Sequence, residues 1–238
     1  MTDLYLNDLR YREAWKLVCG VDEAGRGPLA GPVVVAAVIL NYDIRIDKLN
    51  DSKQVSPAQR ELLFERIIST AFKYSIVEID AAQIDEMNIL QATLAGMRQA
   101  IEAIEEPEAL YLIDGNKSPY AVLEHSFKEL DNGSLNPVLS ENKMVYSALN
   151  SNKNNCLPVI KGDALHACIA AASILAKVHR DRIMLSLHDR YPQYGFDRNK
   201  GYPSPAHLKA INTHGICPIH RMSYAPVQQR YIWELTNL

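Results

Sequence analysis

Two adjacent carboxylates, Asp22 and Glu23, follow the apolar run Leu17–Val21 and precede an arginine that stands between two glycines, Gly25-Arg26-Gly27. Mg²⁺ and Mn²⁺ are hard cations that prefer oxygen ligands, so paired carboxylates at the end of a strand suit them. A glycine on each side of Arg26 lets the backbone approach a ligand more closely than a residue with a Cβ atom would allow. Metal ligands and a close backbone contact within six residues predict phosphoryl-transfer chemistry on a polymeric phosphate.

Two further acids stand at the ends of predicted elements. Asp114 ends the predicted strand Ala109–Ile113, and Asp163 immediately precedes a predicted helix, Ala164–Arg190. Carboxylates at the carboxyl ends of neighbouring strands meet at one edge of an α/β sheet, where ligands usually bind, so these acids are expected to join the first pair. An N-cap role would explain Asp163 without any metal, and that alternative stays open.

The first two acids are neighbours, and successive residues on a straight strand face opposite sides. They can serve one site only if the chain bends there, and Gly25 provides for such a bend. The spacing Gly25-x-Gly27-x-x-x-Gly31 superficially resembles a dinucleotide-binding loop, but such a loop must open into a helix. Pro32 and the β-branched residues Val33–Val35 follow instead, and they predict a strand.

The elements that must position these residues begin as strands and continue as helices. Val33–Leu40, eight consecutive apolar residues, fits a strand buried on both faces. Ser56 starts a helix, since Pro57 occupies the first helical position and Gln59 falls where a capping box requires it. This order predicts an α/β fold with a mixed central sheet flanked by helices. The predicted strands are Trp15–Val21, Val33–Leu40, Ser75–Ile79 and Ala109–Ile113, and the predicted helices are Pro57–Tyr74 (with Leu62, Leu63, Ile67 and Ile68 at core-facing spacing), Asn88–Ile104 and Ala164–Arg190.

Two segments stand apart from this regular pattern. Residues 118–157 lack steady periodicity and end in a polar run, so they are interpreted as a surface insertion. The tail, residues 191–238, is rich in Pro, Gly, His and aromatic residues, which predicts short helices and loops packed on the body. With no internal repeat and no clear linker, residues 1–238 are expected to form a single domain.

The composition is that of an ordinary globular protein, with 47% hydrophobic and 22% charged residues. No apolar stretch reaches the ~18–20 residues of a membrane span, and the polar N-terminus does not resemble a signal peptide. The four cysteines are scattered without zinc-like spacing, which indicates a reduced, cytoplasmic protein. No heptad or apolar edge suggests a dimer, so a monomer is expected.

The net charge of −3 hides an uneven distribution. From residue 160 to the end, ten Lys and Arg stand against five acids, giving +5, while the remaining fifteen basic and twenty-three acidic residues give −8. A basic C-terminal third could hold a phosphate backbone while the acidic remainder limits non-specific binding. A chance imbalance on a solvated face is the alternative, and charge alone does not decide between them.

Taken together, the motifs of this chain resemble bacterial ribonuclease HII, over roughly residues 15–118 and 157–230. Several long motifs in the family's order are far more specific than one short pattern. The motifs that carry the resemblance are Gly20–Pro32 (GVDEAGRGPLAGP), Asn50–Lys53 (NDSK), Ile113–Asn116 (IDGN), Lys161–Asp163 (KGD), Ala170–Val178 (AAASILAKV), Lys200–Pro203 (KGYP), His220-Arg221 and Ser223-Tyr224.

The resemblance implies an RNase H-like fold with a helical C-terminal part. It also implies endonucleolytic cleavage of the RNA strand of RNA–DNA hybrids, and cleavage 5′ of ribonucleotides embedded in duplex DNA, leaving a 3′-hydroxyl and a 5′-phosphate. By position, Asp22, Glu23, Asp114 and Asp163 match the family's four catalytic, metal-binding carboxylates. They would hold two divalent cations, Mn²⁺ or Mg²⁺, one activating the attacking water and one stabilising the leaving oxygen.

The resemblance also implies roles in substrate binding. The motif Gly25-Arg26-Gly27 matches the loop that reads the 2′-hydroxyl, which distinguishes RNA from DNA. Tyr202 matches the tyrosine that stacks on the sugar after the ribonucleotide, and Lys53 resembles a phosphate-contacting lysine. Lys177 and Arg180 lie one turn apart on the predicted long helix and are candidates for backbone contacts, with a merely solvated position as the alternative.

One departure from the family concerns the insertion at residues 118–157, because the acids that match Asp114 and Asp163 lie much closer in the family's sequences. Loop-closure cost grows slowly with length, so the site can survive the insertion. The C-terminal residues 228–235 do not form a convincing clamp-binding peptide.

Two other functions stay open: another metal-dependent nuclease on the same fold, and a catalytically inactive hybrid-binding module. A pure binder gains nothing from buried negative charge beside phosphate, which argues against the second.

Overall fold

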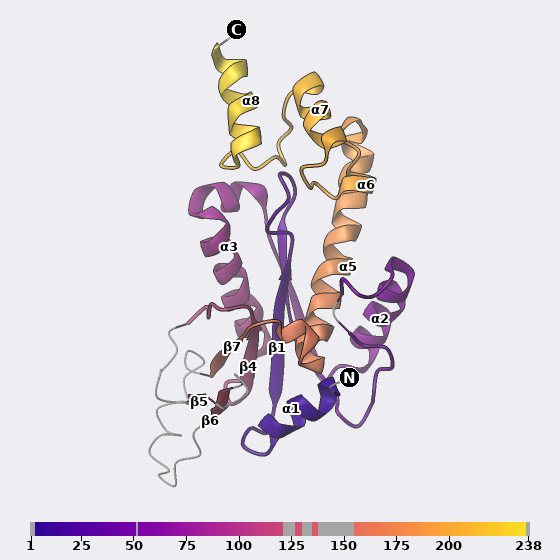
Figure 1. The fold of residues 1–238 in the computed structure, drawn as a ribbon, viewed down its shortest axis with the longest axis vertical. Helices are drawn as coiled ribbons and strands as arrows, with labels where there is room; N and C mark the ends of the chain where they lie inside the picture. The colour runs from indigo at the N-terminus through magenta and orange to yellow at the C-terminus, as the bar shows by residue number, and fades with distance from the viewer. Residues whose placement is uncertain (1–2, 51, 121–126, 130–134, 138–154, 237–238) are drawn as a thin grey trace.

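The structure is a computed structural model and describes residues 3–50, 52–120, 127–129, 135–137 and 155–236. Its centre is a five-stranded sheet in the order β3-β2-β1-β4-β7 (Figure 1). The antiparallel pairs β1·β2 and β2·β3 and the parallel pairs β1·β4 and β4·β7 make the sheet mixed, as predicted. The strands are β1 (Val18–Ala24), β2 (Val33–Ile39), β3 (Lys73–Ile79), β4 (Leu110–Asp114) and β7 (Cys156–Val159), and a separate two-stranded ribbon is formed by β5 (Phe127–Glu129) and β6 (Leu135–Pro137).

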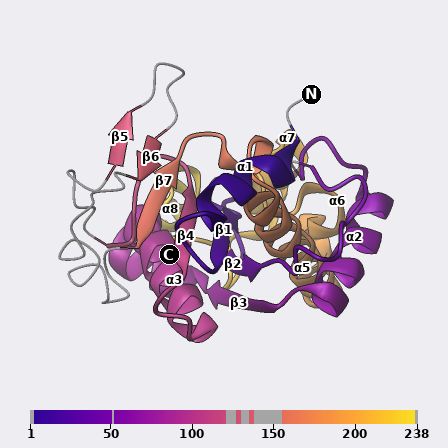
Figure 2. The ribbon, with the colours of Figure 1, turned by 90° about the horizontal axis from the view of Figure 1, so that it is seen from below.

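Helices cover both faces of the sheet (Figure 2). One face packs against α3 (Ala81–Ile104), and the other packs against α5 (Ala167–Arg190), α2 (Pro57–Thr70) and α1 (Leu4–Arg12). Strand β2 is apolar throughout because its residues alternate between the cores on the two faces. Val35, Ala37 and Ile39 point into the core against α3, and Val34, Ala36 and Val38 point into the core against α5 and α2. The continuous apolar run of the sequence is therefore a strand buried on both faces, as predicted.

Strand β1 lies directly on the first turn of α5. A Cβ atom at Gly20 would fall 2.1 Å from the backbone carbon of Cys168, so only glycine permits this close approach. Helix α5 is almost completely buried in its first three turns, where residues 167–176 are small and apolar. This contact fixes the strand that carries the first two acids against the buried half of α5.

The tail forms short helices, as its composition predicts. They pack on the second half of α5 and around Leu29 and Ala30, in a third core that includes Tyr194 and Phe196. An isolated β-bridge between Ala30 and His220 joins this part to the loop after β1. The elements are a 3₁₀ turn η3 (Pro192–Tyr194), α6 (Phe196–Asn199), α7 (Pro205–His214) and α8 (Ala225–Thr236).

Several predicted boundaries were wrong. The first strand extends to Ala24, so both acids lie within it, and α2 ends at Thr70. Helix α3 begins at Ala81 and has a kink at Asn88 (φ 66°), where the prediction placed the start of the helix. The predicted core position Leu62 is 67% exposed, while Leu63 and Ile67 are buried and Ile68 is partly buried.

The N-terminal helix α1 and strand β7 were not predicted from the sequence. Strand β7 begins at Cys156, inside the segment interpreted as a surface insertion, and Cys156 and Leu157 are each 1% exposed. Most of the remaining insertion lies outside the described residues. Among the described helices, none has the length and apolar character needed to cross a membrane.

Candidate active site

Three carboxylates from separate parts of the chain meet at one edge of the sheet. Asp22 lies in β1, Asp114 is the last residue of β4, and Asp163 lies in the 3₁₀ turn η2 (Gly162–Ala164) that follows β7. One oxygen from each of the three falls within 4.8 Å of the others. Asp22 and Asp163 are 5% and 6% exposed, so this is a buried concentration of negative charge.

Asp114 also organises the turn that carries Asp163. Its Oδ1 accepts the backbone N–H of Gly162 at 2.7 Å and that of Asp163 at 3.4 Å. Parallel pairing of β4 with β7 places the two segments side by side although 48 residues separate Asp114 from Gly162. The insertion therefore does not keep Asp163 from the other acids.

Asp163 is not a helix cap. Helix α5 begins at Ala167, three residues later than predicted, and its N-cap residue His166 makes no side-chain capping bond. The free amide of the first turn, the N–H of Cys168, donates instead to the carboxylate of Asp8 in α1 at 2.9 Å. The alternative that explained Asp163 by capping therefore fails, and its carboxylate faces the other two acids.

Burial and nearby charges shift the pKa values of these acids. Burial, then the nearby Glu23 and Asp114, raise the pKa of Asp22 well above its ordinary value. Burial also raises the pKa of Glu23 and of Asp114, and Asp163 adds to the effect on Asp114. Each shift has the sign expected of carboxylates that lose water and face like charges.

Glu23 stands beside the three aspartates. Its backbone N–H donates to Asp22 Oδ1 at 2.7 Å, and its Oε1 accepts from Arg26 Nη1 at 3.3 Å. Its other oxygen, Oε2, is buried and has no hydrogen-bond partner. Hard oxygen donors that are desolvated, mutually repelling and partly unpartnered fit a divalent cation of the Mg²⁺ or Mn²⁺ type.

Two buried serines lie beside Asp22 in the pocket lining, and the sequence prediction missed both as site residues. Ser173 in α5 hydrogen-bonds the Asp22 side chain, which lowers its pKa against the effect of burial. The hydroxyl of Ser52 lies 3.0 Å from that of Ser173, and Arg60 donates to the Ser52 carbonyl at 2.7 Å. Serine at an otherwise apolar stretch of α5 was the one available signal in the sequence.

The loop after β1 turns sharply at Gly25, whose φ of +100° favours glycine. Beneath it lie two fully buried arginines, Arg180 and Arg221, which are 1% and 0% exposed. A Cβ atom at Gly25 would lie 2.1 Å from Arg180 Nε, so the loop rests directly on this guanidinium. Arg180 donates to the carbonyls of Pro32, Lys200 and Ala30, and Arg221 donates to those of Gly31, Arg26 and Gly25.

This arrangement changes the expected role of Arg180. The sequence made it a candidate for contact with the substrate backbone, but its side chain is buried and fully engaged with carbonyl groups of the protein. Arg221 belongs to a sequence motif for which no role was predicted. It supports the loop through bonds to residues nearly two hundred positions away in sequence. Both arginines fix the loop rather than face solvent.

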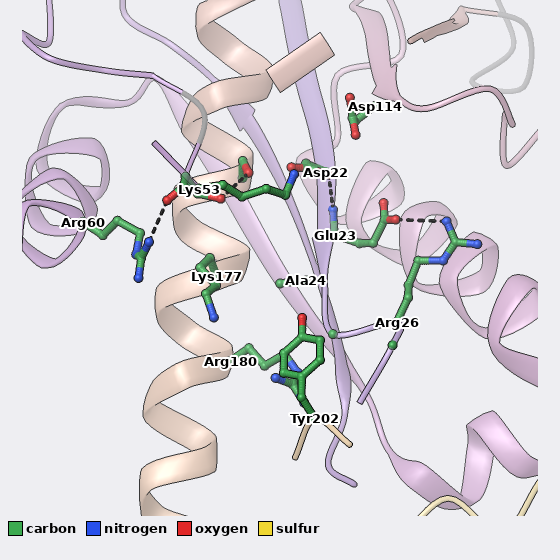
Figure 3. A pocket seen from close by; sticks show the side chains of 14 residues that line it. Asp22, Glu23, Ala24, Arg26, Lys53, Arg60, Asp114, Lys177, Arg180 and Tyr202 are labelled. Carbon is green, nitrogen blue, oxygen red and sulfur yellow. Dashed lines mark hydrogen bonds and ion pairs between the residues drawn. The ribbon is translucent and has the colours of Figure 1, made fainter. Parts of the chain in front are cut away.

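Asp22, Glu23 and Asp114 line one pocket of about 320 Å³ together with the loop after β1. Tyr202, which is 44% exposed, lies across the pocket from the acids, with its ring against the Arg180 guanidinium (Figure 3). Its Cε1 atom would lie 3.6 Å from a Cβ atom placed on Gly27. The lining residues are Asp22–Gly27, Ser52, Lys53, Arg60, Asp114, Ser173, Lys177, Arg180 and Tyr202.

Two of the predicted lysines reach this pocket. Lys53 Nζ forms an ion pair with Asp163 Oδ2 at 3.2 Å, while its side chain stays 79% exposed. Lys177 projects from α5 (Figure 3) and pairs with Asp181 one turn later at 2.6 Å. The structure thus brings eight of the nine predicted site residues to the lining of this pocket, and the ninth, Asp163, pairs with the lining residue Lys53.

The sequence of this chain is similar to that of known proteins. The family model described as Ribonuclease HII matches residues 19–227. The chain belongs to the ribonuclease HII family. Ribonuclease HII of Xylella fastidiosa (strain M12) is 49% identical over 214 residues, covering 90% of this chain and 79% of the relative. Ribonuclease HII of Xanthomonas campestris pv. campestris (strain 8004) is 46% identical over 215 residues, covering 90% and 77%.

A solved structure shows the same fold. The ribonuclease H2 from Pyrococcus horikoshii OT3 matches with a TM-score of 0.66 at 25% identity, covering 93% of this chain and all of the other. The predicted resemblance and the predicted α/β, RNase H-like fold are confirmed. Membership of the ribonuclease HII family makes the chain an enzyme, a hydrolase of the endonuclease class, as predicted.

Proposed function

We propose that this chain hydrolyses the RNA strand of RNA–DNA hybrids and cuts 5′ of ribonucleotides embedded in duplex DNA, leaving a 3′-hydroxyl and a 5′-phosphate. The observation that carries the proposal is the meeting of Asp22, Asp114 and Asp163 oxygens within 4.8 Å. Two of these acids, Asp22 and Asp114, line the same pocket as the braced loop Gly25-Arg26-Gly27 and Tyr202. A site for cleavage thus adjoins a site that can examine the sugar.

The four acids Asp22, Glu23, Asp114 and Asp163 would hold two divalent cations, Mn²⁺ or Mg²⁺. When bound, the cations supply activation of the attacking water and stabilisation of the departing 3′ oxygen. Ser173 and the amides of the η2 turn orient the carboxylates from the protein side. Because Asp22 and Asp163 are buried, water screens their charges only weakly, which strengthens their attraction for a cation.

The loop Gly25-Arg26-Gly27 would read the 2′-hydroxyl. That reading requires a fixed backbone, because a hydroxyl is told from a hydrogen only by polar groups that cannot move to compensate for its absence. Arg221 fixes this backbone through the carbonyls of Gly25 and Arg26. Tyr202 would stack on the sugar that follows the ribonucleotide, and its half-exposed ring across from Gly27 suits that role.

The substrate's phosphates would be held by basic groups around the pocket. Lys53 and Lys177 both line it, and each pairs with a carboxylate that a substrate phosphate would replace as the partner of the lysine. The basic excess of the C-terminal third lies in the part of the chain that supplies Lys177 and Tyr202. This placement supports a path for the phosphate backbone beside the acids.

We also propose that residues 1–238 work as one domain, with residues 118–157 as an insertion, and that the chain acts as a monomer in the cytoplasm. The two sheet-facing cores share the strands of a single sheet, which supports one domain. The scattered cysteines, all buried, support a reducing compartment.

The test is cleavage of three labelled duplexes of one sequence: an RNA–DNA hybrid, a DNA duplex with one ribonucleotide, and an all-DNA duplex. With Mn²⁺ or Mg²⁺ we expect cleavage of the first two, with the cut 5′ of the lone ribonucleotide, and no cleavage of the third. EDTA should abolish both activities. Cleavage of all-DNA duplex would instead support another nuclease on the same fold, and binding without cleavage would support an inactive hybrid-binding module.

A further inference from the structure

Two buried histidines lie behind Tyr202 and have no part in the function proposed above. His207, in the first turn of α7, is 0% exposed, and His220 is 2% exposed. Their Nε2 atoms are 3.1 Å apart, and both rings pack against Tyr194 and Phe196. An imidazole pair in such an apolar enclosure must satisfy its polar atoms internally.

The protons of this pair can be assigned from one fixed acceptor. His207 Nδ1 lies 2.9 Å from the backbone carbonyl of Tyr202, which can only accept, so His207 carries its proton there. Its bare Nε2 must then accept from Nε2–H of His220. The bare Nδ1 of His220 in turn accepts the N–H of Cys217, at 3.0 Å. A single hydrogen-bonded chain thus runs from Cys217 through both rings to Tyr202.

Both rings stay neutral at pH 7, as this chain of bonds requires. Burial lowers the pKa of His207, and burial with the neighbouring His207 lowers the pKa of His220 to about 4. Burial also raises the pKa of Cys217 to about 11, so the thiol beside His220 stays protonated. With both rings and the thiol uncharged, the proton positions assigned above hold at pH 7.

The chain of bonds joins the two parts of the sugar-reading surface. His220 forms a β-bridge with Ala30, and the next residue, Arg221, holds the carbonyls of the loop Gly25-Arg26-Gly27. On the other side, His207 holds the carbonyl of Tyr202, which also accepts the N–H of Ser204 at 2.8 Å. The histidine pair is thus a direct polar link between the residue facing Gly27 and the frame of the loop.

We propose that His207 and His220 are positioning residues that set the place of Tyr202 relative to the loop Gly25-Arg26-Gly27, and so determine selectivity for a lone ribonucleotide. The inference rests on the proposed role of Tyr202 as the reader of the RNA-to-DNA junction. Neither histidine lines the pocket, so both act through the position of Tyr202 relative to the loop.

The test compares His207→Leu, which removes both polar atoms, with His207→Asn, whose amide can still donate to the Tyr202 carbonyl. The measured quantity is kcat/KM on a duplex with one ribonucleotide divided by kcat/KM on a long RNA–DNA hybrid. We expect His207→Leu to lower this ratio about three- to tenfold, the range for loss of one hydrogen bond. His207→Asn should restore most of it.

Ile211→Ala is the matched control, because Ile211 lies one turn further along α7, is 2% exposed and belongs to the same core. It should lower thermal stability without changing the ratio. In a Tyr202→Ala background, His207→Leu should have no further effect on the ratio, since its effect passes through Tyr202.

The outcomes separate the inference from the function on which it rests. If Tyr202→Ala leaves the ratio unchanged, the junction-reading role of Tyr202 fails, and the inference fails with it. If Tyr202→Ala lowers the ratio but His207→Leu does not, only the inference is overturned. A further fall in the ratio when His207→Leu is added to Tyr202→Ala, or an equal fall with Ile211→Ala, would mean that His207 contributes packing alone.

Discussion

Replacing Asp22 by asparagine should stabilise the metal-free protein while destroying its activity. Asp22 is 5% exposed and shares a volume with two other carboxylates whose nearest oxygens lie within 4.8 Å. Asparagine keeps the shape and the acceptor oxygen that the Glu23 N–H uses at 2.7 Å. It removes the charge and replaces one carboxylate oxygen by an NH₂ donor, so the comparison tests mainly the repulsion that a cation would relieve.

The magnitude follows from Coulomb's law. Two unit charges 4.8 Å apart repel by about 3 kcal/mol at an effective dielectric constant near 20. The raised pKa values show that the site takes up protons and so avoids part of this cost, and Lys53 offsets another part through Asp163. A gain of about 1–3 kcal/mol is therefore expected, which for a chain of this size raises Tm by about 3–10 °C.

The gain should depend on pH with a defined sign. The pKa of Asp22 is raised above its ordinary value of 3.8, so over the range above that value the folded protein retains a proton that the unfolded chain releases. Stability of the metal-free wild type therefore falls as pH rises through this range toward the raised pKa. Asparagine lacks this dependence. The difference in Tm between variant and wild type should be small near pH 4 and largest near pH 8.

The assay is thermal unfolding in EDTA at several pH values, followed by circular dichroism. Asp189→Asn, an exposed position at the end of α5, is the control and should change stability by no more than about 0.5 kcal/mol. Adding Mn²⁺ should raise Tm of the wild type more than that of Asp22→Asn. A lower Tm for Asp22→Asn at pH 8, or a difference that does not vary with pH, would refute the claim of mutual repulsion.

Three further predictions concern activity and folding. Asp114→Asn should lower metal-dependent cleavage about a hundredfold or more with the fold intact, measured by cleavage rate and circular dichroism. Tyr202→Ala should reduce kcat/KM at a lone ribonucleotide more than in a long hybrid. Asp8→Ala should destabilise the protein by about 3 kcal/mol in urea unfolding, because the buried Asp8 accepts bonds from Tyr42, His166 and Cys168. Turnover at the wild-type rate, equal losses on both substrates, or an unchanged urea midpoint would contradict these predictions in turn.

Much of the fold follows from local pattern. The run Val33–Leu40 predicted β2 because a strand between two cores must be apolar on both faces. Ser56 predicted the start of α2, and its hydroxyl does accept the N–H of Gln59. Local chemistry also placed Asp114 at a strand end, since β4 is short, apolar and bounded by that acid.

Tertiary contacts decided the rest. Asp163 had the sequence context of a cap, but Asp8, 160 residues away from Cys168, supplies the first-turn acceptor of α5. Arg180 had the spacing of a solvent-facing residue, yet carbonyl groups of a distant loop enclose it. Local patterns contain no trace of such partners.

The most direct test of the cation-binding pocket is the anomalous difference map of crystals grown with Mn²⁺. We predict manganese peaks coordinated by carboxylate oxygens of Asp22, Asp114 and Asp163, beside the loop Gly25-Arg26-Gly27. Peaks only at other places, or none at saturating Mn²⁺, would contradict the assignment of these acids as the metal site.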